Sequence, residues 1–226
     1  MRKITINLAA VAAFCIVVAS PALVSSSCAT PKTEQEDTTI IREDSGITAL
    51  KYSSPEVPAS IEFCGKTIDL SRFDRHERMD RELLAFTYMH STSLQMLKKA
   101  NRYFPIVEPI LKENGIPDDF KYLMVIESNM NPTARSSAGA AGLWQFMQGT
   151  GRDYGLEVNN NVDERYHIEK ATRAACRYLK DAYAKYKDWV AVAASYNAGQ
   201  ARIASQLAKQ DVDDSLDLQL VEETAR

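Results

Sequence analysis

Residues 125–147 of the chain are VIESNMNPTARSSAGAAGLWQFM, the stretch that is most informative about the fold and function. One carboxylate, Glu127, stands at the end of an apolar helical run, directly before a loop of Asn, Ser, Ala and Gly. Phe120, Leu123 and Met124 indicate that this helix enters a core, where desolvation raises the pKa of a carboxyl group. A helix-end acid that simply points to water is the alternative, because exposed glutamate is the common case.

Helical patterns lie on both sides of this stretch. Asn114-Gly115 marks a helix end, and Pro117 is a favourable restart. We find no alternating strand pattern of any length, so the predicted fold is all-α. The predicted helices span about 73–103, 104–113, 118–128, 163–187, 189–196 and 201–207.

The N-terminus has the order of a secretory signal, in which charged residues precede apolar and then small ones. Two bases come before an apolar run over residues 4–19, and small residues lead from there to Cys28. A permanent membrane helix is the alternative, but Asn7 interrupts the run, and a spanning helix needs about 20 apolar residues. We therefore predict that residues 1–27 are a signal peptide.

Cys28 stands where bacterial lipoproteins carry the cysteine that receives lipid. A lipobox usually has Leu three positions earlier, where this chain has Ser25, so ordinary cleavage nearby stays an alternative. Residues 28–60 are polar and have no sustained period, which predicts a flexible linker. The predicted location is the periplasm of a Gram-negative bacterium, and a lipid anchor at Cys28 in the outer membrane is the further hypothesis.

Charge and cysteine content narrow the function classes. The net charge of -3 lacks the basic excess of nucleic-acid-binding proteins, so nucleic acid is not an expected partner. Cys64 and Cys176 either form a disulfide or lie as two small buried side chains, and both alternatives stay open. The histidines have no metal-ligand spacing, so we predict neither a metal nor a cofactor. They are His76, His90 and His167.

Four short motifs follow one another in the second half of the chain. They are Glu127-Ser128, PTARS at 132–136, GAAGLWQFM at 139–147 and YNAG at 196–199. Together they resemble the lytic transglycosylases of the goose-type-lysozyme-like superfamily, glycoside hydrolase family twenty-three. The form GLWQFM, with DER at 163–165 and Asp188-Trp189 downstream, is most similar to the membrane-bound lytic murein transglycosylase D group.

This resemblance implies a lysozyme-like helical domain with a substrate groove. It covers residues 104–226, which we expect to be the catalytic domain, and residues 61–103 are expected to be an N-terminal helical segment that packs on it. The final stretch, 221–226, resembles one that continues into another helix in the family, so the domain is expected to be cut short at its C-terminus.

The resemblance also implies roles for individual residues. Glu127 corresponds to the catalytic acid and base. Short polar groups can hold an N-acetyl group or the Glu127 side chain, and a tyrosine can stack on a sugar. For one groove residue, Met147, a core position is an equal alternative. The implied groove residues are Ser136, Gln145, Met147, Tyr196 and Asn197.

Other residues of the motifs are expected to be structural. Gly139 and Gly142 are predicted to flank a tight approach of the backbone to the groove, where Gly reaches conformations that other residues cannot. Residues 163–165 stand at the start of a predicted helix, so we interpret them as capping and ion-pairing residues. Trp144 is a candidate core residue.

The resulting hypothesis is an enzyme that cleaves the bond between N-acetylmuramic acid and N-acetylglucosamine in peptidoglycan glycan strands. A goose-type lysozyme, which adds water to the same bond, and a non-catalytic peptidoglycan-binding protein are the alternatives. Glycosidases usually need two carboxylates, and no motif ties a second one to the groove. We therefore predict a product with a 1,6-anhydro ring. The acids considered for a second role are Asp153, Glu157, Asp163 and Asp188.

Overall fold

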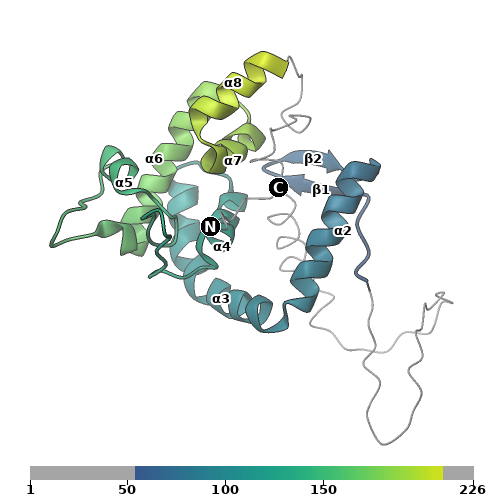
Figure 1. Cartoon of the computed structure of the whole chain (residues 1–226), viewed down its shortest axis with the longest axis horizontal. Helices are drawn as coiled ribbons and strands as arrows, with labels where there is room; N and C mark the ends of the chain where they lie inside the picture. The colour runs from purple at the N-terminus through teal and green to yellow at the C-terminus, as the bar shows by residue number, and fades with distance from the viewer. Residues whose placement is uncertain (1–53, 211–226) are drawn as a thin grey trace, which may run out of the picture.

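The computed structural model describes residues 54–210 (Figure 1). These residues form a set of helices, two of which make a long central pair, and one short hairpin. The all-α prediction is confirmed, with that hairpin as its one exception among the described residues. The predicted signal peptide, Cys28 and most of the predicted linker lie outside this range. None of the helices within it has both the length and the apolar content that crossing a bilayer requires.

The elements follow one another along the chain from the hairpin to the last helix. They are β1 Ser60–Phe63, β2 Lys66–Asp69, α2 Phe73–Tyr88, α3 His90–Glu113, η2 Asp118–Tyr122, α4 Leu123–Ser128, α5 Gln148–Asp153, η3 Glu164–Tyr166, α6 Ile168–Tyr186, α7 Trp189–Ala198 and α8 Gln200–Gln210.

The β1–β2 hairpin was not predicted from the sequence, because each of its strands has only four residues. The antiparallel strands are joined by the two-residue turn Cys64-Gly65, whose φ angles are 53° and 78°. A two-residue loop with both φ angles positive matches the right-handed twist of the strands. At this turn the Cys64 backbone N–H donates to Asp119 Oδ2 at 2.6 Å, so the hairpin is fastened to η2.

Helix α3 ends at Glu113 as predicted, but it begins elsewhere than the sequence indicated. The sequence predicted one helix up to Tyr103 and another from Phe104, but the chain breaks at Met89 and then runs as one helix to Glu113. Pro105 and Pro109 are tolerated inside it because both lie on its exposed side, where water can bond the carbonyls that lose their N–H partners. The assignment of residues 61–103 and 104–226 to separate segments stays a prediction.

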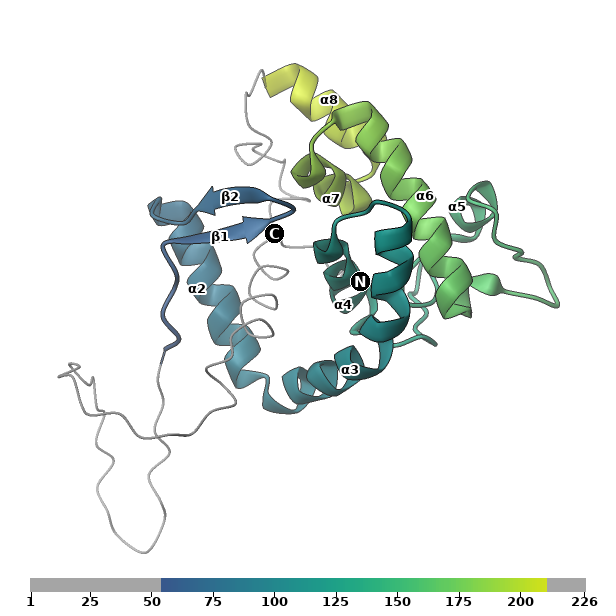
Figure 2. The same ribbon diagram turned by 180° about the vertical axis from the view of Figure 1, so that it is seen from behind.

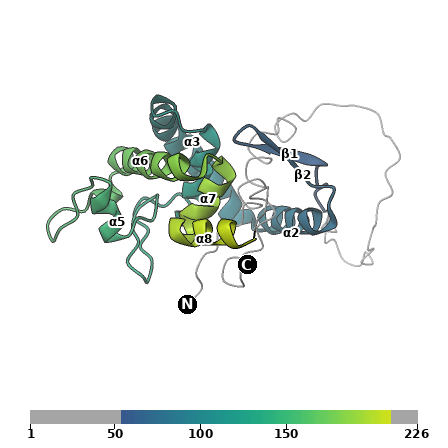
Figure 3. The same ribbon diagram turned by 90° about the horizontal axis from the view of Figure 1, so that it is seen from above.

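Helices α3 and α6 pack on each other at the centre of the core, and Figure 2 shows the C-terminal part of α3 next to α6. Figure 3 shows α6, α7 and α8 close together, with α2 and the hairpin on the other side of the molecule. The buried face of α6 is mostly alanine, which lets the helix axes approach closely. Cys176 lies on that face as a buried free thiol, so the alternative of a disulfide between Cys64 and Cys176 is wrong. Burial raises the pKa of the Cys176 thiol to about 11.

Two α-helices begin later than predicted, because a short 3-10 helix occupies the first residues of each predicted helix. The predicted helix over 118–128 is η2 followed by α4. The predicted helix over 163–187 is η3 followed by α6, and the His167 side chain caps the start of α6. The short helix α5 was not predicted, because its sequence QGTGRD contains two glycines and no apolar side chain.

Candidate active site

Glu127 lies at the last turn of α4, held at the point where the helix meets the following loop. The chain leaves the helix through Asn129 and Met130, which both adopt left-handed φ angles of 49° and 51°. The buried Ser128 hydroxyl lies 2.9 Å from the Met124 carbonyl oxygen and 3.0 Å from that of Leu143. Ser128 therefore ties the helix end that carries Glu127 to the loop over residues 134–147.

The Glu127 carboxyl is partly buried, and desolvation raises its pKa from 4.5 to about 8. Desolvation is the cause of this shift, whereas a second carboxylate within about 4–6 Å would add charge repulsion. At neutral pH Glu127 is therefore mainly protonated. A carboxylic acid in this state can donate a proton to a leaving group.

Phe146, Tyr154, Tyr178 and Tyr196 form an aromatic wall, in which Tyr178 and Tyr196 lie near enough to Glu127 for its charge to act on them. Tyr178 and Tyr196 have ring centroids 5.2 Å apart, and Phe146 lies 6.4–6.5 Å from both. Burial raises the pKa of Tyr196 well above its usual value, and the nearby Glu127 charge adds to this shift. The Tyr196 hydroxyl donates to the Trp144 carbonyl at 2.7 Å, which joins α7 to the loop.

Tyr178 was missed by the sequence analysis, although a signal was present. It stands four residues after Ala174 and four before Ala182, both buried, and this spacing places it on the buried stripe of α6. Burial raises the pKa of Tyr178 to about 12, and the Glu127 charge adds to this shift. Tyr178 therefore belongs to the same site as Glu127 and Tyr196.

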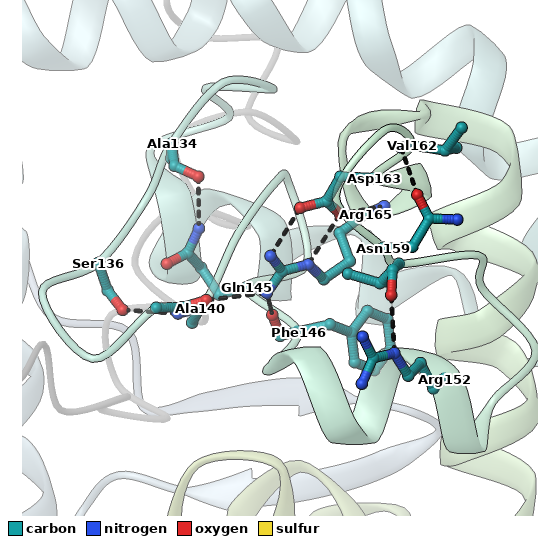
Figure 4. Close-up of polar contacts among 12 residues, drawn as sticks. Ala134, Ser136, Ala140, Gln145, Phe146, Arg152, Asn159, Val162, Asp163 and Arg165 are labelled. Carbon is teal, nitrogen blue, oxygen red and sulfur yellow. Dashed lines mark hydrogen bonds and ion pairs between the residues drawn. The ribbon is translucent and has the colours of Figure 1, made fainter.

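Ser136 and Gln145 shape the loop beside the site (Figure 4). Ser136 Oγ accepts from the Ala140 backbone N–H at 3.0 Å, so this hydroxyl closes the turn over 136–140. Gln145 Nε2 lies 2.8 Å from the Gly142 carbonyl and 3.3 Å from that of Ala134. The Gln145 amide therefore uses its N–H groups to fix the backbone, which the sequence analysis did not foresee.

Arg165 fastens the same loop to η3 from the inside of the molecule. Its side chain is almost fully buried and forms a two-pronged ion pair with Asp163, at 2.9 Å from Nε and 2.7 Å from Nη2. Nη1 donates to the carbonyls of Gly139 and Phe146 at 2.8 Å and 3.0 Å, contacts that Figure 4 shows in part. The structural interpretation of residues 163–165 is confirmed, because Asp163 also caps η3.

Neither glycine of the loop matches the prediction that both flank a close approach of the backbone to the groove. A Cβ on Gly142 would stand 1.9 Å from the Arg165 carbonyl oxygen, so the close approach is to η3. Around Gly139 no described atom lies within 4 Å of such a Cβ, and only its φ of +89° favours glycine.

The remaining predicted residues differ in exposure. Trp144 is fully buried and donates from Nε1 to Thr172 Oγ1 at 3.0 Å, so it is a core residue. Met147 is 45% exposed, which excludes the core alternative for it. Asn197 is exposed on α7, next to Tyr196. The groove roles of Ser136, Gln145, Met147, Tyr196 and Asn197 stay predictions.

The acids considered for a second catalytic role are mostly engaged elsewhere. Glu157 Oε1 accepts from Asn159 Nδ2 at 2.7 Å, and Asp188 Oδ1 accepts from the Val190 backbone N–H at 3.0 Å. Asp163 is bound to Arg165, and Asp153 is exposed at the end of α5. Over residues 54–210, no group of three or more His, Cys, Asp or Glu side chains is arranged to hold a metal ion.

Residues 105–217, half of the chain, match the family described as the Transglycosylase SLT domain. The chain belongs to this SLT family. The resemblance to lytic transglycosylases that the four motifs indicated is thereby confirmed.

Two relatives show how much of a longer protein the SLT chain covers. The membrane-bound lytic murein transglycosylase D of Escherichia coli K12 is 31% identical over 128 residues, which are 56% of this chain and 27% of that protein. The peptidoglycan transglycosylase gp16 of Escherichia phage T7 is 33% identical over 95 residues, 41% of this chain and 7% of that protein. The SLT chain thus spans about a quarter or less of the length of these relatives.

Proposed function

We propose that this chain is a peptidoglycan lytic transglycosylase that cleaves the β-1,4 bond between N-acetylmuramic acid and N-acetylglucosamine, for cell-wall remodelling or turnover. The observation that carries the proposal is the desolvated carboxyl group of Glu127, which lies beside Tyr178 and Tyr196. The raised pKa of Glu127 keeps this carboxyl protonated at neutral pH. SLT family membership and the activities that the names of the two relatives state support the same substrate.

The mechanism needs one carboxyl group that acts twice. Glu127 protonates the oxygen of the leaving N-acetylglucosamine as its bond to muramic C1 breaks. The muramic N-acetyl oxygen stabilises the positive charge that develops at C1. The muramic C6 hydroxyl then attacks C1 and gives its proton to the Glu127 carboxylate, which restores the acid and closes a 1,6-anhydro ring without water.

The mass of the released sugars tests this reaction. Digestion of purified peptidoglycan is expected to give muramic ends that are one water molecule lighter than hydrolysed ends, because C6 replaces water as the nucleophile. Mass spectrometry of the soluble fragments measures the difference directly. Hydrated, reducing muramic ends as the main product would favour the goose-type lysozyme alternative. Binding without release of fragments would favour the non-catalytic one.

We also propose that the chain works in the periplasm of a Gram-negative bacterium, anchored to the outer membrane by lipid on Cys28. The residue order before Cys28 and the membrane-bound relative support an envelope location. Wild-type protein is expected to enter the detergent phase on phase partitioning, and Cys28→Ala to stay in the aqueous phase. Equal partitioning of the two proteins would contradict the anchor.

A further inference from the structure

A cavity of about 320 Å³ lies beside the loop over residues 134–147. Its lining includes Arg135, Met147, Gln148 and Asn159, together with the Asp163–Arg165 pair, and does not include Glu127. Ligand sites usually have volumes of about 300–1,000 Å³, so this cavity fits a small group rather than a chain of sugars. The proposed mechanism gives it no role.

Of the charged side chains that line the cavity, one cation, Arg135, is left to bind a ligand. Asp163 and Arg165 neutralise each other, and the hydrogen bonds from Arg165 hold the pKa of Asp163 below its usual value. The Arg135 guanidinium makes no hydrogen bond to any residue in 54–210, although its charge also lowers the pKa of Asp163. The cavity therefore has a surplus positive charge.

The uncharged polar groups of the cavity differ in availability. Asn159 Oδ1 accepts the backbone N–H groups of Asn161 and Val162, both at 2.8 Å, so its carbonyl is used within its own turn (Figure 4). The Gln148 side chain is exposed and, within the described part of the chain, makes no hydrogen bond. Arg135 and Gln148 thus present N–H donors without acceptors, which favours an anionic ligand.

The cavity is connected to the Glu127 site by the backbone of residues 146 and 147. Met147 lines the cavity, and Phe146, one residue earlier, belongs to the aromatic wall. Arg165, at the cavity, donates to the Phe146 carbonyl at 3.0 Å. A group bound in the cavity and a sugar beside Glu127 would therefore lie next to neighbouring residues of one fixed segment.

We propose that this cavity binds a carboxylate of the peptide stem of peptidoglycan, with Arg135 as its main ligand and Gln148 as a second donor. The inference rests on the proposed function, because that function brings stem-bearing glycan to the loop. Muramic acid carries the stem, and the stem carries free carboxylates, whereas the N-acetylglucosamine units are uncharged. A guanidinium pairs with a carboxylate through two parallel hydrogen bonds, which gives geometric specificity as well as affinity.

Kinetics on two substrates test the proposal. Wild-type protein, Arg135→Gln and Arg135→Lys are compared on stem-bearing strands and on strands from which an amidase has removed the stems, which leaves the muramic lactyl carboxylate but none of the carboxylates of the stem. Arg135→Gln is expected to lower kcat/KM on stem-bearing strands about tenfold more than on stem-free strands, mainly through KM. Arg135→Lys is expected to fall between the two, because it keeps the charge but loses the two-pronged geometry.

Arg81→Gln is the matched control, since it removes an arginine on α2 whose side chain is 66% exposed and which, within residues 54–210, forms an ion pair only with the neighbouring Glu82. It is expected to keep the wild-type ratio between the two substrates. An equal loss on both substrates in Arg135→Gln, or no loss on either, would overturn the stem site and leave the proposed function standing.

A binding measurement separates the stem site from the cleavage chemistry. Calorimetric titration of Glu127→Gln protein with the disaccharide-tetrapeptide is expected to give a Kd about tenfold lower than titration with the same disaccharide lacking its peptide. Adding Arg135→Gln is expected to remove the difference. Equal Kd values for the two ligands would overturn the stem site, even if the wild-type protein cleaves neither substrate and the proposed function itself fails.

Discussion

Glu127→Gln is expected to reduce the release of peptidoglycan fragments by about a hundred- to ten-thousand-fold, because an amide keeps the shape of the side chain but cannot deliver a proton. The loss should appear in kcat, since Gln still fits beside Tyr178 and Tyr196. Initial rates on purified peptidoglycan measure it. Glu62→Gln, an exposed glutamate on β1, is the control and is expected to keep wild-type activity. Activity retained in Glu127→Gln would exclude Glu127 as the acid.

The pH dependence of stability distinguishes a chemical role of Glu127 from a structural one. The pKa of its carboxyl is about 8 in the folded protein and near 4.5 in the unfolded chain. Well below pH 4.5 both states hold the proton, so the ionisation of Glu127 does not change the free energy of unfolding there. Between these two values the unfolded chain releases the proton first, so the free energy of unfolding falls as the pH rises, by on the order of a few kcal/mol.

Glu127→Gln removes this titration, so it is expected to unfold at a higher temperature than the wild type at pH 8 and at a similar temperature near pH 4.5. Melting curves across that range give the comparison. A variant that melts below the wild type at every pH would mean that the carboxyl stabilises the fold, and its lost activity would then say nothing about proton transfer.

Much of the fold could be predicted because long amphipathic helices have a strong period. The stripe of small residues on α6 and the apolar face of α3 both lie where their spacing placed them. The helix break at Met89 could not be predicted, because prolines 105 and 109 are stronger local break signals and only their exposure in the folded chain makes them harmless. The hairpin was missed although its turn, Cys64-Gly65, contains the glycine that such turns favour.

The sequence identified Glu127 but not how its surroundings act on it. The motif letters give residue types at fixed spacing, and they place Ser136 and Gln145 beside the acid without showing where their hydrogen bonds go. In the structure both side chains bond the backbone of their own loop. Tyr178 comes from a distant helix, so its place beside Glu127 depends on packing between α6 and α7, which no local pattern contains.

Gly142→Ala is expected to destabilise the protein by about 3 kcal/mol or more, the largest effect on stability that we predict. Two costs add at this position. A left-handed φ of +77° costs an L-residue roughly 1–2 kcal/mol, and forcing extra atoms into a packed site costs about 1–3 kcal/mol. The new Cβ would stand 1.9 Å from the Arg165 carbonyl oxygen, and backbone at this point cannot rotate away as a flexible side chain could.

Thermal melts of three alanine variants separate the two costs. Gly149 in α5 has neither a positive φ nor a described atom within 4 Å of its new Cβ, so Gly149→Ala is expected to be neutral or slightly stabilising. Gly139→Ala meets only the cost of φ and should lose about 1 kcal/mol. Gly142→Ala meets both, which for a domain of this size corresponds to a fall in Tm of roughly 6 °C or more. Equal losses at Gly139 and Gly142 would mean that the loop moves away from η3 at little cost, and Arg165 would then not be what holds the loop beside Glu127.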